Sequence, residues 1–378
     1  MNRNEQKLFL RFCEVLHTGD GSAPEFVRRN ATGAVLGQLF MNRMAGVAYG
    51  NLRDSGHLSL VNREFRNSLR AAYQQNAEKN RSYLACISRT TELLRSVNVP
   101  YAMLKGALLC ALYPEGYRTA NDIDLLVRPM DVTTIGQCLL AGGFRQGDIR
   151  EDRFVPATRK QIIESRMMRG ETVPYILEVD LPQMKYLEVD VNFSLDYKNG
   201  DDAILAGMLQ RATDVTVGQT RVHTLVLTDF FLHLCLHLYK EATTYPWIAM
   251  GRDMTLYKFA DISLVAGFLI ASDVDRLFDK AREYGLEREL VYAVLLSDAL
   301  LPVANRDLVR RAKGTARGIP DVMREVWDPA SGKRLLYPDA RLVKRFFAGD
   351  RSALLCEAPQ IPHTEPFHTG KSEEKNRK

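Results

Sequence analysis

The amino-acid sequence predicts an α+β protein in which a mixed or antiparallel sheet lies between two helical segments. Apolar residues recur at helical spacing before residue 96 and again after residue 201, whereas the stretch between them contains short runs that alternate apolar and polar side chains as strands do. We therefore expect an N-terminal helical segment (1–96), a sheet-bearing core (97–200), a C-terminal helical domain (201–350) and a polar, disordered tail (357–378).

The helices are predicted from apolar residues that repeat every three or four positions. In the first segment, Leu8, Phe9 and Phe12 share one helical face, and the polar run Asp54–Gly56 predicts a loop. The long helix after this loop is expected from Asn62 to Ser96. In the last segment, Thr228–Asp229 is a candidate N-cap, and further helices are expected over 255–270, 273–284 and 286–300.

The core is predicted from short alternating segments separated by turn residues. Pro100 is tolerable only at a sheet edge or at the start of a strand, and Pro114 with Gly116 ends a short helix. The expected elements are strands over Val97–Leu104, Asp122–Val127, Tyr175–Leu181 and Tyr186–Phe193, and helices over Ala107–Tyr113 and 131–142.

Composition narrows the class of protein. The net charge of +5 over 378 residues permits an anionic partner such as a nucleotide, while a nucleic-acid partner is left open but not indicated. No apolar run is long enough to span a bilayer, so we expect no membrane partner. The six cysteines are scattered and form no C-x-x-C pair, so we expect neither a zinc site nor a disulfide framework. Free thiols fit a reducing cytoplasm.

The sharpest chemical signal is the strand Asp122–Val127. Side chains alternate along a strand, so Asp122 and Asp124 share one face and leave the other face apolar. Two adjacent carboxylates repel each other unless a cation or protons intervene, and Mg²⁺ prefers such oxygen ligands. By itself this pattern is more often a solvated edge strand than a metal site.

Residues before this strand make a metal site the better interpretation. Lys105–Gly106 stands between an expected strand and a helix, where a glycine lets the backbone approach a phosphate. Lys105 would add a positive charge, although a solvated lysine at a strand end fits equally well. Arg118 lies close enough in sequence to reach the same anion.

A third carboxylate is available downstream. On the strand Tyr186–Phe193, Asp190 lies on the polar face, and an acid there would complete a two-metal site. Asp180, in a similar Glu-Val-Asp context on the preceding strand, is the competitor. We favour Asp190 because its strand alternates without a break.

These residues together resemble a known family. The ordered set Leu104–Leu108, Tyr113–Pro114, Gly116, Arg118, Asp122–Val127 and Gly143–Phe144 resembles the uncharacterised nucleotidyltransferase family of bacteria, within the DNA-polymerase-β-like superfamily. The resemblance is strongest over residues 97–145 and extends more loosely to the helix bearing His233 and His237. It implies a polymerase-β-like nucleotidyltransferase core in residues 97–200.

The resemblance also implies roles. Gly106 would take the place of the phosphate-binding turn, Asp122 and Asp124 would be the metal-binding pair, and Asp190 the third carboxylate. Asn192 and Phe193 stand near where many relatives show histidine and tryptophan, so the acceptor pocket is expected to differ.

The implied reaction is transfer of a nucleoside monophosphate from a nucleoside triphosphate to an acceptor hydroxyl, with release of pyrophosphate. Two Mg²⁺ ions would serve as cofactors, with Mn²⁺ as an alternative. The acceptor is a small molecule, a peptide or protein, or RNA. The rival hypothesis is a catalytically silent relative that binds a nucleotide or a protein.

Other signals favour structural roles. His233 and His237 share a helical face but lack a third ligand, so packing is the better interpretation. The family resemblance leaves open the alternative that they, with Lys240, face a nucleotide cleft. Asp261 is expected to be a buried acid that orients its helix. The sequence contains no P-loop, nucleophile elbow or Rossmann fingerprint.

Overall fold

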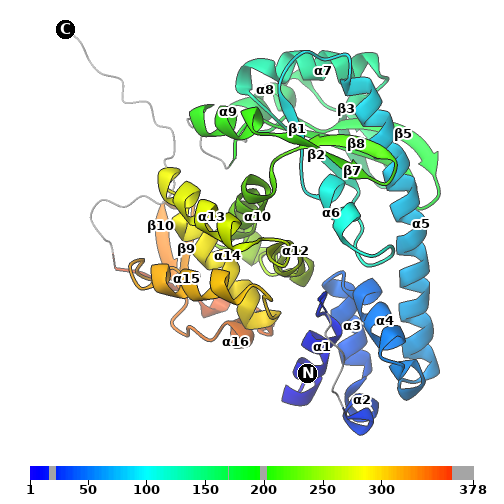
Figure 1. Cartoon of the computed structure of the whole chain (residues 1–378), viewed down its shortest axis with the longest axis vertical. Coiled ribbons are helices and arrows are strands. Elements are labelled where there is room, and N and C mark those ends of the chain that lie inside the picture. Colours follow the sequence, from blue (N-terminus) through cyan, green and yellow to red (C-terminus); the bar gives the residue numbers. More distant parts are fainter. Residues whose placement is uncertain (17–22, 169, 196–201, 360–378) are drawn as a thin grey trace.

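The computed structural model describes residues 1–16, 23–168, 170–195 and 202–359. It confirms the mixed α+β class: a large mixed sheet lies at one end, and two groups of helices lie beside each other at the other (Figure 1). Helix α5 (Arg63–Leu94) runs along one side and joins the N-terminal helices to the sheet. The other elements before the sheet are α1 (Arg3–Phe12), α2 (Pro24–Asn30), α3 (Gly33–Met41), α4 (Ala45–Asp54) and the 3₁₀ helix η1 (His57–Leu60).

The main sheet has eight strands in the order β4-β3-β5-β6-β2-β1-β8-β7. It is mixed because β2 runs parallel to β6 and β1 parallel to β8, whereas the other pairs are antiparallel. Its strands are β1 (Tyr101–Met103), β2 (Asp122–Val127), β3 (Arg145–Arg150), β4 (Arg153–Pro156), β5 (Tyr175–Leu181), β6 (Met184–Asn192), β7 (Thr213–Val217) and β8 (Thr220–Thr224). Between them lie α6 (Gly106–Leu112), η2 (Pro129–Asp131), α7 (Val132–Ala141), α8 (Arg159–Met168) and α9 (Asp202–Gln210).

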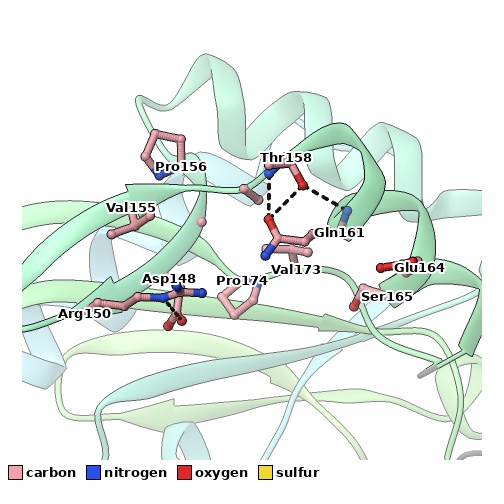
Figure 2. A pocket seen from close by; sticks show the side chains of 12 residues that line it. Asp148, Arg150, Val155, Pro156, Thr158, Gln161, Glu164, Ser165, Val173 and Pro174 are labelled. Carbon is pink, nitrogen blue, oxygen red and sulfur yellow. Dashed lines mark hydrogen bonds and ion pairs between the residues drawn. The ribbon is translucent and has the colours of Figure 1, made fainter.

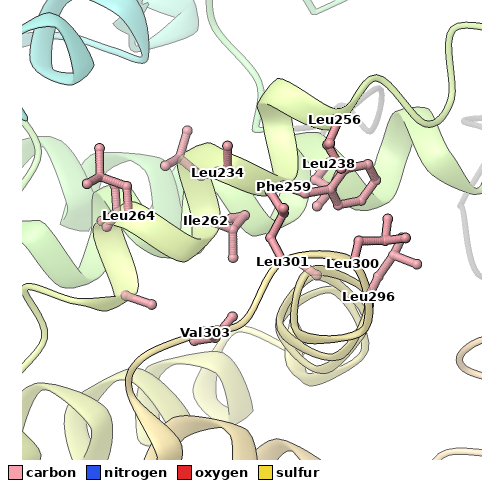
Figure 3. Packing of buried hydrophobic residues seen from close by; sticks show 14 of the residues in the cluster. Leu234, Leu238, Leu256, Phe259, Ile262, Leu264, Leu296, Leu300, Leu301 and Val303 are labelled. Atoms are coloured by element: carbon pink, nitrogen blue, oxygen red, sulfur yellow. The ribbon is translucent and has the colours of Figure 1, made fainter. Parts of the chain in front are cut away.

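The rest of the chain is mainly helical. Side chains from α10, α12 and α14 point toward one another in an apolar core that includes Leu238, Phe259 and Leu300 (Figure 3). The elements are α10 (Leu227–Ala242), α11 (Tyr245–Ala249), α12 (Leu256–Ala266), α13 (Ala271–Glu283), α14 (Glu287–Leu300), α15 (Arg306–Ala316), α16 (Leu342–Phe346), η3 (Ser352–Leu354) and a small sheet of β9 (Glu325–Asp328), β10 (Lys333–Leu336) and β11 (Cys356–Glu357).

The two helical segments are not independent of each other. Residues from both belong to one hydrophobic cluster, and the Phe9 ring stacks on Phe346 with ring centroids 6.1 Å apart. Burial of large aromatic side chains in this way is a main source of folding free energy. The N-terminal helices therefore pack against the C-terminal helices and are not attached to the sheet-bearing segment alone.

Several predicted boundaries were wrong. The polar stretch after residue 144 forms β3, β4 and α8, and β7 and β8 continue the main sheet into a region expected to be helical. These strands are short and mostly polar, with single buried residues such as Val217 and Val222, so they carry little periodicity. The expected cap at Thr228–Asp229 is also wrong, because α10 begins at Leu227 and the Asp229 carboxylate accepts a hydrogen bond from Arg211 at 3.0 Å.

The expected disordered tail lies mostly outside the described residues, which end at 359. Glu357, the first residue of the predicted tail, pairs with Leu335 as part of β11. Among the helices that the structure describes, none is both long and apolar enough to cross a membrane.

Candidate active site

Two parallel neighbouring strands bring the predicted carboxylates together. In the β2–β6 register, Asp122 pairs with Glu188 and Asp124 pairs with Asp190. Asp122, Asp124 and Asp190 all line one cavity of about 400 Å³. The cavity lies at the meeting point of the sheet, the turn after α3, and helices α10 to α12. The sheet thus carries an acidic wall, as the alternation in the sequence predicts.

Lys105 supplies a positive charge at this wall. Its Nζ lies 2.8 Å from Asp124 Oδ1, and the side chain is mostly buried. Burial alone would lower the pKa of Lys105, but the charge of Asp124 and the hydrogen bond to it raise that pKa overall. Lys105 has a positive φ (41°), a backbone conformation that is uncommon for a residue other than glycine.

The acidic wall carries more negative charge than one lysine can offset. Burial, followed by the charge of Asp124, raises the pKa of Asp122. The same two causes raise the pKa of Asp190 well above its ordinary value. Burial and the charge of Asp122 raise the pKa of Glu188 to about 7. An additional cation at this wall would relieve the repulsion.

Gly106 lines the cavity and begins α6. A Cβ added here would lie 2.6 Å from Ala120 Cβ and 2.7 Å from Tyr83 Oη. The absence of a side chain is therefore required by packing, independently of any phosphate.

Arg118 also lines the cavity, but a protein carboxylate already binds its guanidinium. Its Nε and Nη2 lie 3.1 and 3.2 Å from the two oxygens of Asp261. Asp261 is buried and also accepts a hydrogen bond from Tyr113 at 2.9 Å. The aspartate therefore orients Arg118.

The competitor Asp180 lies elsewhere. It precedes the β5–β6 turn with a left-handed backbone (φ 47°), at the point where the strand register shifts. It is not among the described residues that line the cavity. The register shift at the end of β5, which the sequence did not reveal, distinguishes Asp180 from Asp190.

The helical wall contains residues that sequence reasoning missed or left open. His237 and Lys240 line the cavity, whereas His233 is buried and neither of its ring nitrogens has a hydrogen-bond partner within the described residues. Glu241 forms an ion pair with Lys258, and its Oε1 lies 3.3 Å from His237 Nε2. Asn192, which the sequence placed near the acceptor pocket, also lines the cavity. The remaining lining residues that were not predicted are Arg43, Thr119, Ala120, Asn121, Glu171, Trp247 and Tyr257.

A second cavity of about 860 Å³ lies between α8 and strands β3 and β4 (Figure 2). Asp148 and Arg150 line one side, and Thr158, Gln161 and Ser165 line the other. It lacks the three aspartates, so the smaller cavity is the one that gathers the predicted site residues.

The protein thus has a mixed α+β fold that presents both carboxylates and basic side chains to one cavity. The chain belongs to the family of uncharacterised nucleotidyltransferases, whose model matches residues 31–302. No curated protein is significantly similar to the chain. The crystal structure of an antigenic nucleotidyltransferase-like protein from Paracoccidioides brasiliensis is similar at 16% identity and a TM-score of 0.29, covering 52% of this chain and 90% of that one.

Proposed function

We propose that this protein transfers a nucleoside monophosphate from a nucleoside triphosphate to an acceptor hydroxyl in a magnesium-dependent reaction, with release of pyrophosphate. The observation that carries the proposal is the register of β2 and β6, which sets Asp190 directly beside Asp124 at the cavity that Asp122 also lines. Family membership supports nucleotidyl transfer in general. We also propose that the sheet corresponds to the polymerase-β-like core.

The donor set fits Mg²⁺. Carboxylate oxygens are its preferred protein ligands, and the raised pKa values of Asp122 and Asp190 reflect an excess of negative charge that a divalent cation would offset. Within the described residues, no three acidic, histidine or cysteine side chains converge as a ready-made metal cage. A bound Mg²⁺ would therefore need substrate phosphates and water to complete its coordination.

Asp122, Asp124 and Asp190 would hold the metal. When bound, Mg²⁺ supplies Lewis acidity at the phosphate oxygens and lowers the pKa of the acceptor hydroxyl. Asp190 would accept the hydroxyl proton as the acceptor oxygen bonds to the α-phosphorus. The bond from the α-phosphorus to its bridging oxygen breaks, and pyrophosphate leaves with that electron pair.

The remaining residues would bind and orient the reactants. Lys105 holds Asp124 through its 2.8 Å contact. The backbone at Gly106 would lie close to the phosphate chain, and Arg118, fixed by Asp261, would contribute charge at the cavity. The acceptor would approach beside Asp190 and Asn192.

One observation favours a second candidate function, that of a catalytically silent relative that only binds its ligand. The Lys105 ammonium already provides Asp124 with a cation, as a binding protein without a metal would require. Such a protein would bind a nucleotide without turning it over.

The test is transfer of label from triphosphates to acceptors in a host-cell extract with Mg²⁺. Label at the α-phosphate should appear in product, and label at the γ-phosphate should not. Asp122→Ala or Asp124→Ala should abolish transfer while the protein stays folded. Transfer of γ-label would indicate a kinase. Wild-type transfer rates in both variants would exclude the proposed mechanism, and nucleotide binding without any transfer would favour the silent relative.

A further inference from the structure

The cavity is lined by basic side chains as well as by carboxylates. Its basic lining residues include Arg43, Lys105 and Arg118. Lys105 is bound to Asp124, and Arg118 is bound to Asp261 through two contacts. Both cations are thus engaged by protein carboxylates. In the part of the chain that the structure describes, Arg43 forms no such ion pair.

Arg43 is held in place by its neighbours. It lies between α3 and α4 with a left-handed backbone (φ 55°), a conformation that is costly for a residue other than glycine. The side chain of the preceding Asn42 accepts a hydrogen bond from the Leu256 backbone N–H at 3.0 Å. This buried contact ties the turn to the start of α12, which is why an arginine from the N-terminal helices reaches the cavity.

Tyr257 provides a platform for the Arg43 guanidinium. The Arg43 Cζ lies 5.3 Å from the centroid of the Tyr257 ring, and Arg118 Cζ lies 4.4 Å from the same centroid. Stacking on an aromatic ring restricts a guanidinium without using its N–H donors. Those donors therefore stay available to an anion in the cavity.

Charge on this side of the cavity favours an anion. Burial, with the charges of Lys105 and Arg43, lowers the pKa of Lys258 to about 7. Like charges that repel one another in this way are stabilised by a multiply charged anion. The acidic wall opposite would repel the same anion, so a phosphate chain needs cationic contacts on the helical side.

We propose that Arg43 binds the phosphate chain of the nucleotide, so that the N-terminal helices form part of the active site. This inference rests on the proposed function and adds a phosphate ligand that lies outside the sheet-bearing core. The planar guanidinium donates two parallel hydrogen bonds to phosphate oxygens, which a lysine cannot do.

The experiment is calorimetric titration of the full chain with inorganic tripolyphosphate and Mg²⁺. Arg43→Gly is the main variant, because glycine accepts the left-handed backbone and should leave the turn folded. We expect its dissociation constant to rise about 10- to 50-fold, the usual loss for a charge-assisted hydrogen-bonding group. Arg43→Lys should weaken binding less, by about 3- to 10-fold, since it keeps charge but loses the planar fork.

Arg28→Ala is the matched control, because Arg28 is exposed on α2 and forms no ion pair in the described residues. It should change affinity by less than about 2-fold. Equal affinities for wild type and Arg43→Gly would overturn the role of Arg43 and leave the proposed function standing. A wild-type protein that binds neither tripolyphosphate nor any nucleoside triphosphate would overturn both.

Discussion

Individual residues at the site are constrained as much by packing as by chemistry. Gly106 is the clearest case, because Ala120 and Tyr83 leave no room for a Cβ. The sequence identified Gly106 through its position between a strand and a helix. It could not show which neighbour excludes a side chain, since Ala120 and Tyr83 are distant in sequence.

Gly106→Ala should therefore destabilise the protein by about 1–3 kcal/mol through overpacking. Adding Ala120→Gly should recover part of this loss, because it removes one of the two close contacts. Denaturant unfolding of the single and double variants measures both effects.

Gly314→Ala is the control for this prediction. Gly314 lies in α15 with nothing within 4 Å of an added Cβ, so the alanine should stabilise by about 0.5–1 kcal/mol. A Gly106→Ala variant as stable as wild type would show that the packing around α6 is looser than described.

His233 makes stability depend on pH. Burial, with the charges of Lys105 and Lys240, lowers its pKa from 6.5 to about 3. Between these values the unfolded chain binds a proton that the folded protein does not, so stability falls as the pH drops below about 6.5.

His233→Leu should reduce the loss of unfolding free energy between pH 7 and pH 5 by about 2 kcal/mol. The leucine also removes two buried ring nitrogens that have no partner in the described residues. Urea unfolding at both pH values measures the difference. Identical losses in wild type and variant would mean that His233 is solvated in the folded protein.

At the scale of elements, α5 positions the segment that leads into β2. The Asn80 side chain accepts a hydrogen bond from the Gly116 N–H at 2.8 Å and donates one to the Arg118 carbonyl at 2.7 Å. Tyr83, one turn further along the helix, donates to the Asp122 carbonyl at 2.8 Å. The helix thereby fixes the backbone on which Arg118 and Asp122 stand.

Asn80→Ala should destabilise the protein by about 2–4 kcal/mol, because it leaves two buried backbone groups unpaired. Gln75→Ala, at an exposed position of the same helix, should stay within about 0.5 kcal/mol of wild type. Chemical unfolding compares the two. A change of less than about 0.5 kcal/mol in the unfolding free energy of Asn80→Ala would indicate that water replaces the hydrogen bonds of the side chain.

The elements differ in how far the sequence could predict them. β2 and β5 were predicted to the residue because each contains a run of consecutive buried residues. α5 was predicted to within two residues because its apolar positions recur at helical spacing over 32 residues. β3, β4, β7 and β8 were missed because each is short and partly exposed. The residues of the candidate site differ in the same way. Local spacing indicated Asp122 and Asp124, whereas Arg43 and Tyr257 reach the cavity only through tertiary packing.

At the scale of the whole molecule, three parts of the chain meet at one cavity. The sheet contributes Asp122, Asp124 and Asp190, the C-terminal helices contribute His237 and Tyr257, and the N-terminal helices contribute Arg43. Because the two helical groups share a hydrophobic cluster, they form a single wall opposite the sheet. A nucleotide bound in the cavity would contact all three parts.

The central claim is that the carboxylates of β2 and β6 act together in nucleotidyl transfer. It is tested most directly by the single-turnover rate of α-label transfer with Mg²⁺ for wild type, Asp190→Asn and Asp180→Asn. We expect Asp190→Asn to lower the rate by at least about 100-fold, as loss of a general base does, and Asp180→Asn to stay within about 2-fold of wild type. A wild-type rate in Asp190→Asn, or loss of transfer in Asp180→Asn alone, would contradict it.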